Sequence, residues 1–193
     1  MGYPFASTRA QDTVLDFLNT VFRHDGRLVD RFHRDEDVVA WLDATPLREC
    51  YVAHHEVAAY CGLAGEARQL REHLHQLIAQ RKAGAPLHIS LLNHLLASGS
   101  YWTELIDGQH GRVSSVYRFA AETPRQVLMP VMLAAAELLA RDDFSSIRQC
   151  AAPSCVFWFL DRSRSHRRRW CSMATCCNRH KGPRFFLGTN VIL

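Results

Sequence analysis

The sequence predicts an α+β protein, in which a mostly helical N-terminal domain with a small β-hairpin or sheet precedes a small cysteine-rich module. Three observations predict this class. Apolar residues recur at helical spacing over most of the first 142 residues, a β-rich pattern interrupts them once, and five of the seven cysteines lie between residues 150 and 177. The expected boundaries are residues 10–142 and 145–187, and we expect residues 10–142 to fold when expressed alone.

Helices are expected where apolar side chains repeat every three or four residues, because that spacing places them on one helix face. Val14, Leu18 and Phe22 form such a stripe, and Gly62 is positioned to break or kink a longer one. Thr123 is the expected N-cap of a strongly apolar helix that belongs in the core. The expected helices cover residues 11–23, 32–42, 56–82, 86–98 and 123–141.

The residue pattern changes in the middle of the chain. Residues 101–106 and 112–119 are rich in β-branched and aromatic side chains, and residues 107–111 (DGQHG) are turn formers. This pattern predicts an antiparallel hairpin.

Charge is distributed unevenly along the 193 residues, which carry a net charge of +4. Residues 150–193 hold eight basic residues and one acid, a net charge of +7, whereas the rest of the chain has a net charge of −3. A basic segment on an acidic body favours a polyanionic partner. The N-terminus shows no signal-peptide pattern, and no apolar run is long enough to span a bilayer, so we expect a cytoplasmic protein with no membrane partner.

The cysteines of the basic segment have the spacing of a metal site. The pattern C-x4-C-x15-C-x4-C is formed by Cys150, Cys155, Cys171 and Cys176. An odd cysteine total without a secretory signal argues against disulfides, and two close thiolate pairs match the tetrahedral preference of zinc. We therefore predict a small four-cysteine zinc-finger module with one zinc ion; the alternatives are an iron–sulfur cluster or four unrelated buried thiols. Cys177, His166 and His180 are alternative ligands, although the matching spacing favours Cys176.

Basic side chains surround these cysteines. Arginine binds phosphate in a bidentate manner and stacks on bases, which predicts a nucleic-acid surface. The alternatives are a solvated face, or a face that pairs with the acidic body. The aromatic residues 157–159 are expected to form a strand that packs the module against the body. The candidate nucleic-acid-binding residues are Arg162, Arg164, Arg167, Arg168, Arg169, Arg179, Lys181 and Arg184.

Two segments resemble a known pair of domains. Residues 169–181 (RWCSMATCCNRHK) closely resemble the C-terminal CGNR zinc finger of bacterial proteins, and the upstream Phe159, Asp161 and Ser163 also fit it. Residues 15–20 (LDFLNT) resemble the opening of the ABATE-type domain that usually precedes this finger. The family is described as stress-induced transcription regulators. The resemblance implies a zinc-binding transcription regulator, with a DNA-binding finger and an N-terminal domain that senses or binds a small-molecule or protein ligand.

The chain departs from the family pattern at two places. Cys177 replaces the glycine of the naming motif, which would strain the turn if that position needs a positive φ. Residues 185–193 are apolar where further basic residues are expected, which would weaken DNA contact or create a docking or homodimer surface.

Two other classes of function compete with the regulator. The finger could be a structural or protein-docking module that binds no nucleic acid. An enzyme is not expected, because the sequence has no glycine-rich phosphate loop, nucleophile elbow or His-Glu-x-x-His helix. Asn19, a polar residue among apolar ones at a helix end, is expected to be buried and hydrogen-bonded rather than ligand-binding.

Overall fold

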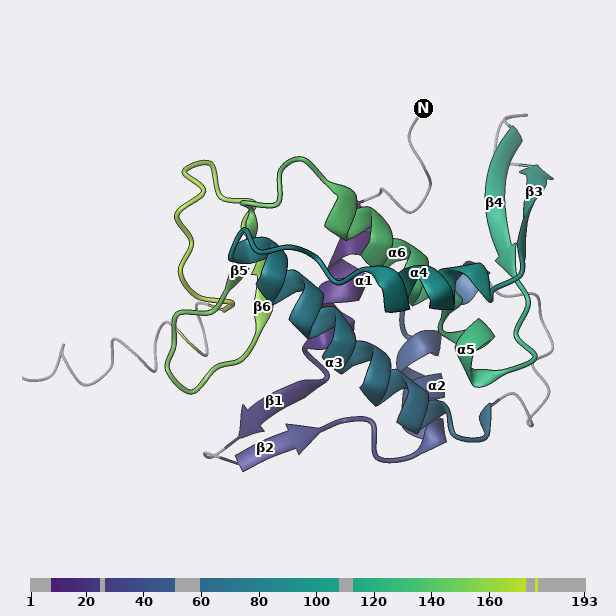
Figure 1. Ribbon diagram of the computed structural model, residues 1–193, viewed down its shortest axis with the longest axis horizontal. Helices are drawn as coiled ribbons and strands as arrows, with labels where there is room; N and C mark the ends of the chain where they lie inside the picture. Colours follow the sequence, from purple (N-terminus) through teal and green to yellow (C-terminus); the bar gives the residue numbers. More distant parts are fainter. Residues whose placement is uncertain (1–7, 25–26, 51–59, 108–112, 173–175, 177–193) are drawn as a thin grey trace, which may run out of the picture.

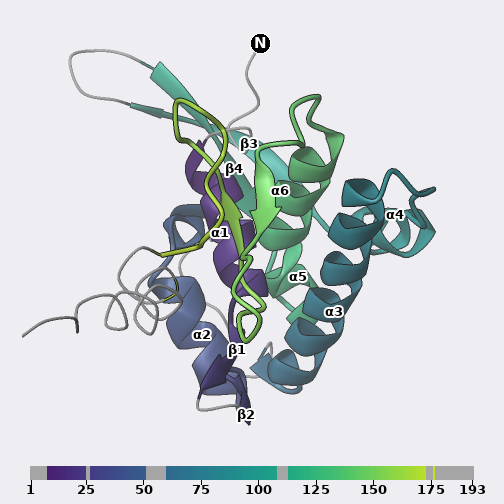
Figure 2. The same cartoon turned by 90° about the vertical axis from the view of Figure 1, so that its left-hand side faces the viewer.

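The computed structural model describes residues 8–24, 27–50, 60–107, 113–172 and 176 (Figure 1). Helices α1, α3 and α6 pack against one another, and in Figure 2 both α6 and α3 lie to the right of α1. The helices are α1 (Thr8–Leu18), α2 (Asp35–Asp43), α3 (Leu63–Lys82), α4 (Ser90–Ala97), α5 (Pro124–Val127) and α6 (Met129–Ala140), with a 3-10 turn η2 (Pro46–Cys50).

The strands in the described part of the chain form three separate antiparallel pairs. The predicted hairpin is confirmed, with Tyr101 opposite Phe119 and Asp107 opposite Val113. Together with the helices, these pairs confirm the predicted α+β class. The pairs are β1 (Val21–His24) with β2 (Arg27–Asp30), β3 (Tyr101–Asp107) with β4 (Val113–Phe119), and β5 (Ile147–Gln149) with β6 (Trp158–Leu160).

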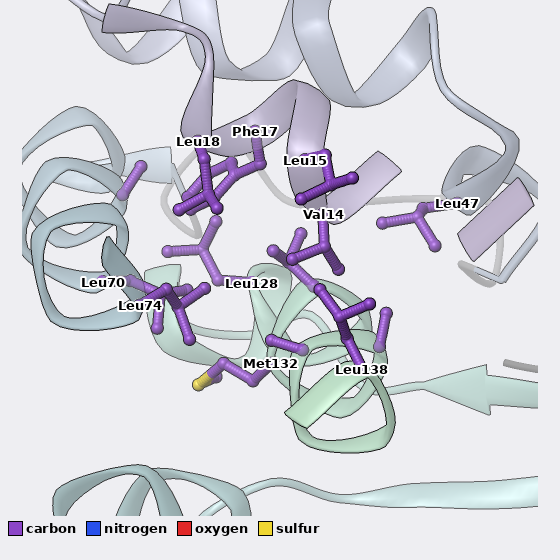
Figure 3. Close-up of a cluster of buried hydrophobic side chains, with 14 of the residues drawn as sticks. Val14, Leu15, Phe17, Leu18, Leu47, Leu70, Leu74, Leu128, Met132 and Leu138 are labelled. Carbon is purple, nitrogen blue, oxygen red and sulfur yellow. The ribbon is translucent and has the colours of Figure 1, made fainter. Parts of the chain in front are cut away.

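The core lies where α1, α3 and α6 meet. Val14 and Leu18 of α1 are fully buried, together with Leu74 of α3 and Leu138 of α6 (Figure 3). The apolar helix predicted at residues 123–141 does belong to the core, but it is divided at Leu128 into α5 and α6. Pro130 lacks the N–H that would continue the regular hydrogen bonding of one helix. No helix in the described part of the chain has the length and apolarity needed to cross a membrane.

The helix predicted at residues 11–23 is wrong at its C-terminal end, because α1 ends at Leu18 and strand β1 follows. Thr20 turns the chain there: its hydroxyl donates to the carbonyl of Phe17 at 2.6 Å, and its own carbonyl accepts from the Arg31 N–H at 2.8 Å. Val21 and Phe22, which match the helical stripe, lie instead in β1 and pair with β2.

The long helix predicted at residues 56–82 begins only at Leu63, and residues 56–59 lie outside the described residues. Gly62 breaks it with a φ of 84°, a left-handed conformation that glycine adopts at little cost. The Asp35 carboxylate accepts from the N–H groups of Gly62 and Ala64 at 2.9 and 2.8 Å, so α2 caps the start of α3. The helices predicted at 32–42 and 86–98 are present with later starts, as α2 and α4.

The main core extends beyond residue 142. Ile147 is fully buried, and Phe144 and Trp158 are nearly so, in the same cluster as the helical side chains. A fragment of residues 10–142 would lose these three side chains and expose the apolar surface they cover. We expect it to retain helical circular dichroism but to unfold several degrees below the full chain in a thermal melt. An equal or higher melting temperature would contradict this prediction.

Candidate metal centre and nucleic-acid surface

The four predicted metal ligands come together in space. The thiol sulfurs of Cys150, Cys155, Cys171 and Cys176 all lie within 4.8 Å of one another. The Cys155 and Cys171 sulfurs are 3.7 Å apart, and the Cys171 and Cys176 sulfurs 3.5 Å apart. Tetrahedral zinc with bonds of about 2.3 Å needs sulfur–sulfur separations of about 3.8 Å. The spacing therefore fits one zinc ion.

Two short turns position these thiols. The first follows β5: the Cys150 N–H donates to the Phe157 carbonyl at 2.8 Å, and the Cys155 N–H to the Ala152 carbonyl at 2.9 Å. The second turn is held against the first by the Ala151 N–H, which donates to the Arg169 carbonyl at 2.8 Å. The Cys171 N–H then lies 3.5 Å from the Cys150 sulfur. Each loop therefore holds the other in place around the thiol cluster.

Two of the four thiols, those of Cys155 and Cys171, resist losing their protons; burial would also raise the pKa of Cys150, but hydrogen bonds to its sulfur outweigh burial and lower that pKa. Burial, and then the neighbouring thiols, raise the pKa of Cys171 far above its usual value, and burial raises the pKa of Cys155 to about 11. A bound zinc ion reverses this preference because it coordinates thiolates. A zinc ion held by these four sulfurs would supply the charge that binds the turns together, and the centre would be structural because all four ligand positions are protein sulfurs.

The structure describes only some of the residues considered as alternative metal ligands. His166 is exposed and is not part of the thiol cluster. Cys176 is part of it, as the matched spacing predicts. Cys177, His180 and the apolar segment 185–193 lie outside the described residues.

Arg162 and Arg168 are committed to contacts within the chain. One terminal nitrogen of Arg162 donates to both carboxylate oxygens of Asp12 on α1, at 2.8 Å each. Arg168 lies 4.7 Å from the ring centre of Phe159, donates to the Trp170 carbonyl at 2.8 Å, and also contacts the Cys171 carbonyl. These two arginines therefore hold the finger to the body and the second ligand loop in place.

Three other predicted arginines face solvent. Arg164, Arg167 and Arg169 are exposed on the loop between the two ligand pairs, and Arg169 stacks 5.4 Å from the ring centre of Trp170. Their charges point outward beside the metal centre. The remaining candidates, Arg179, Lys181 and Arg184, lie outside the described residues.

Comparison with protein families agrees with this arrangement. Residues 11–142, more than half of the chain, match the ABATE family, described as "Putative stress-induced transcription regulator". The chain belongs to the ABATE family. Residues 146–185 match the CGNR zinc finger. A comparison with curated proteins found no match.

The ABATE opening LDFLNT contains a residue that joins the two parts of the molecule. The Asn19 amide donates to the Trp158 carbonyl at 2.8 Å and accepts from the Trp158 N–H at 2.9 Å. It therefore pairs with β6 as a neighbouring strand would. The hydrogen bonding expected for Asn19 is confirmed, although the residue is half-buried rather than buried. Its partner, 139 residues away, could not be deduced from the sequence. The packing of the aromatic strand against the body is also confirmed, since Trp158 belongs to the main core.

Asn19→Ala should destabilise the ABATE-family fold by about 2 kcal/mol, because it leaves a backbone donor and acceptor of Trp158 without partners. Urea unfolding of the zinc-loaded protein measures this loss. Asn93→Ala, on the exposed face of α4, is the matched control and should change the free energy of unfolding by less than about 0.5 kcal/mol. Equal stability of the two variants would show that the Asn19 amide contributes nothing to docking.

Asp161 of the CGNR motif organises the arginine loop. Its buried carboxylate accepts from the Ser163 N–H at 3.0 Å, the Ser163 hydroxyl at 2.6 Å and the Arg168 N–H at 2.8 Å. Burial would raise the pKa of Asp161, but these hydrogen bonds outweigh it and hold the pKa below its usual value. Arg148 fastens the same loop by donating to the His166 carbonyl at 2.6 Å. The loop that displays the exposed arginines is therefore held at several points.

Proposed function

We propose that this ABATE-family protein is a transcription regulator that binds DNA through the exposed arginines of its zinc finger. The observation that supports the proposal is the position of Arg164, Arg167 and Arg169, outward-facing on a loop held by Asp161 beside the metal centre. Guanidinium groups in that setting suit phosphate oxygens, and phosphate contacts account for much of the affinity of DNA-binding proteins. The proposal includes a cytoplasmic location, a role in the stress response and no catalytic activity.

The position of these arginines on a loop favours contact with the DNA backbone over contact with the bases. No described helix carries the arginines, so no element in that part of the chain is available to enter the major groove in the manner of a recognition helix. The three arginines instead lie on an irregular loop, which suits contacts to successive phosphates. We therefore expect affinity with little sequence preference from this face, and strong dependence on salt.

Replacing Arg164, Arg167 and Arg169 together with alanine should weaken binding to a duplex of about 20 base pairs and reduce the slope of log K against log salt by about 3. Zinc content should stay at one equivalent, because none of the three is a ligand. The matched control replaces three exposed arginines of the helical domain, Arg27, Arg48 and Arg125, with the same loss of charge. Equal losses in both variants, or no duplex binding by the wild type at low salt, would contradict the proposal.

A second candidate function is a structural finger that docks on the body and binds no nucleic acid. The Asn19–Trp158 pair and the Arg162–Asp12 ion pair favour it, because both join the finger to α1 or to the residue that follows it. The two candidates differ in the DNA titration. The docking candidate predicts that Arg162→Ala lowers stability while the wild type shows no salt-dependent DNA binding.

A further inference from the structure

A groove of about 630 Å³ lies where the finger meets the helical domain. Its walls come from α1, from the turn after α2, and from β6 with the loop that follows it. Figure 2 shows the finger segment running beside α1, where these walls meet. Pockets for small molecules commonly have volumes of about 300–1,000 Å³ and occur preferentially at junctions between domains.

Most of the polar groups that line this groove are already bonded within the protein. The Asn19 amide pairs with the Trp158 backbone, and the Thr45 hydroxyl donates to the Leu42 carbonyl at 2.8 Å. Arg168 is held by the carbonyls of Trp170 and Cys171. A ligand would therefore meet few free donors here. The apolar part of the lining is formed by Leu15, Ala44, Pro46, Trp158, Phe159 and Leu160.

The carboxylates of the lining differ from these groups. Asp12 and Asp16 are four residues apart on α1, so both face the groove from successive turns. Asp12 shares its charge with the half-exposed Arg162. Asp16 accepts from the Trp41 indole N–H at 2.8 Å, and no lysine or arginine among the described residues forms an ion pair with it. Carboxylates only accept hydrogen bonds, so the unused polar capacity of the groove requires a donor.

We propose that this groove binds an organic cation. An ammonium or amidinium group would lie beside Asp16 and Asp12, where a charged donor gains most, and an apolar portion would pack on Leu15 and Pro46. An organic anion fits less well, because the two arginines of the lining are already engaged, Arg162 with the Asp12 carboxylate and Arg168 with the Trp170 and Cys171 carbonyls. The proposal does not depend on nucleic-acid binding. Because both domains line the groove, an occupant would stabilise the docked position of the finger.

The test uses three probes with one ring and different charges: 2-phenylethylamine, 2-phenylethanol and 3-phenylpropanoate. Each is titrated into the full-length, zinc-loaded protein in a calorimeter. We expect the amine to bind with a Kd of about 1 mM or tighter, and the other two at least about tenfold more weakly. Asp16→Asn should weaken amine binding about tenfold, and Asp142→Asn, an exposed acid outside the groove, should leave it unchanged.

A second variant tests the groove independently, in case Asp16→Asn loses amine binding only because it folds poorly. Ala44→Trp keeps both carboxylates but fills part of the groove, so it should abolish amine binding. Three results would overturn the proposal: no binding of the amine by the wild type, equal affinity for all three probes, or unchanged amine affinity in both groove variants. None of these readouts involves DNA, so failure here is separate from failure of the proposed function.

Discussion

Cys150→Ser is expected to lose its zinc ion almost completely, from one equivalent in the wild type to less than about a tenth. Cys150 is the most buried of the four ligands, and its sulfur also accepts the Cys171 N–H at 3.5 Å. Losing it removes one coordination bond and one contact between the two ligand loops. Structural zinc sites in small fingers have apparent binding free energies of about 10–16 kcal/mol, so the finger should unfold while the helical domain keeps its far-ultraviolet signal.

Metal analysis of purified protein and a chelator titration of the wild type measure this effect. Cys61→Ser is the matched control, because Cys61 is exposed and lies outside the thiol cluster. Cys177→Gly should also keep its zinc if Cys176 is the fourth ligand. Zinc retained by Cys150→Ser, or lost from Cys177→Gly, would contradict the assignment. Iron and visible absorption in the wild type would instead indicate an iron–sulfur cluster.

Arg71→Met should destabilise the fold by about 3 kcal/mol. The Arg71 guanidinium, 7% exposed, forms a bidentate ion pair with Asp30 and donates to the Thr20 hydroxyl at 2.8 Å. Methionine fills a similar volume but leaves the partly buried carboxylate without its cation. Arg125→Met removes a solvent-exposed pair with Glu66 and should cost less than about 1 kcal/mol. Equal losses in the two variants would show that burial adds nothing to the Arg71 pair.

The same variant should alter the pH dependence of stability. Burial would raise the pKa of Asp30, but the hydrogen bonds from Arg71 and the Phe32 N–H outweigh it, so the pKa lies below its usual 3.8. A lowered pKa contributes stability above about pH 3.8 that is lost as the pH falls through the folded value. The stability difference between wild type and Arg71→Met should therefore shrink below that pH. Zinc loss at low pH affects both proteins and cancels in the difference.

Local patterns in the sequence predict the structure well, and long-range pairings are predicted poorly. The four cysteines, the hairpin at residues 101–119 and the apolar helix before Arg141 are all recognisable from spacing or residue type. The helix prediction fails at residues 21–23 because Val21 and Phe22 fit both a helical stripe and a short strand. Strand β5 is not predicted because three residues carry too little pattern. Its partner β6 follows from a denser aromatic run.

The roles of individual polar residues at the site are harder to deduce. Arg162 and Arg168 look like the other arginines of the basic run and are exposed as they are; their contacts with Asp12 and the Cys171 carbonyl distinguish them. Asp161 carries one usable signal, because it is the only acid in a segment with eight basic residues. A lone acid among arginines that is also buried is well placed to bind backbone N–H groups, as it does here.

The two hydrogen bonds between the Asn19 amide and the Trp158 backbone limit which chimeras of this chain and its relatives can fold. The Asn19 amide bonds only main-chain atoms of Trp158, so a finger grafted from another family member should keep these two hydrogen bonds, provided that its side chain there fills the core space of the Trp158 ring. The register of β6 relative to Asn19 is the stricter condition for such a graft. Inserting one residue into the connection before β6 would turn the strand over and present the wrong face to α1. A chimera should therefore tolerate sequence divergence at the seam where the apolar side chain at position 158 is kept, but not a change of length.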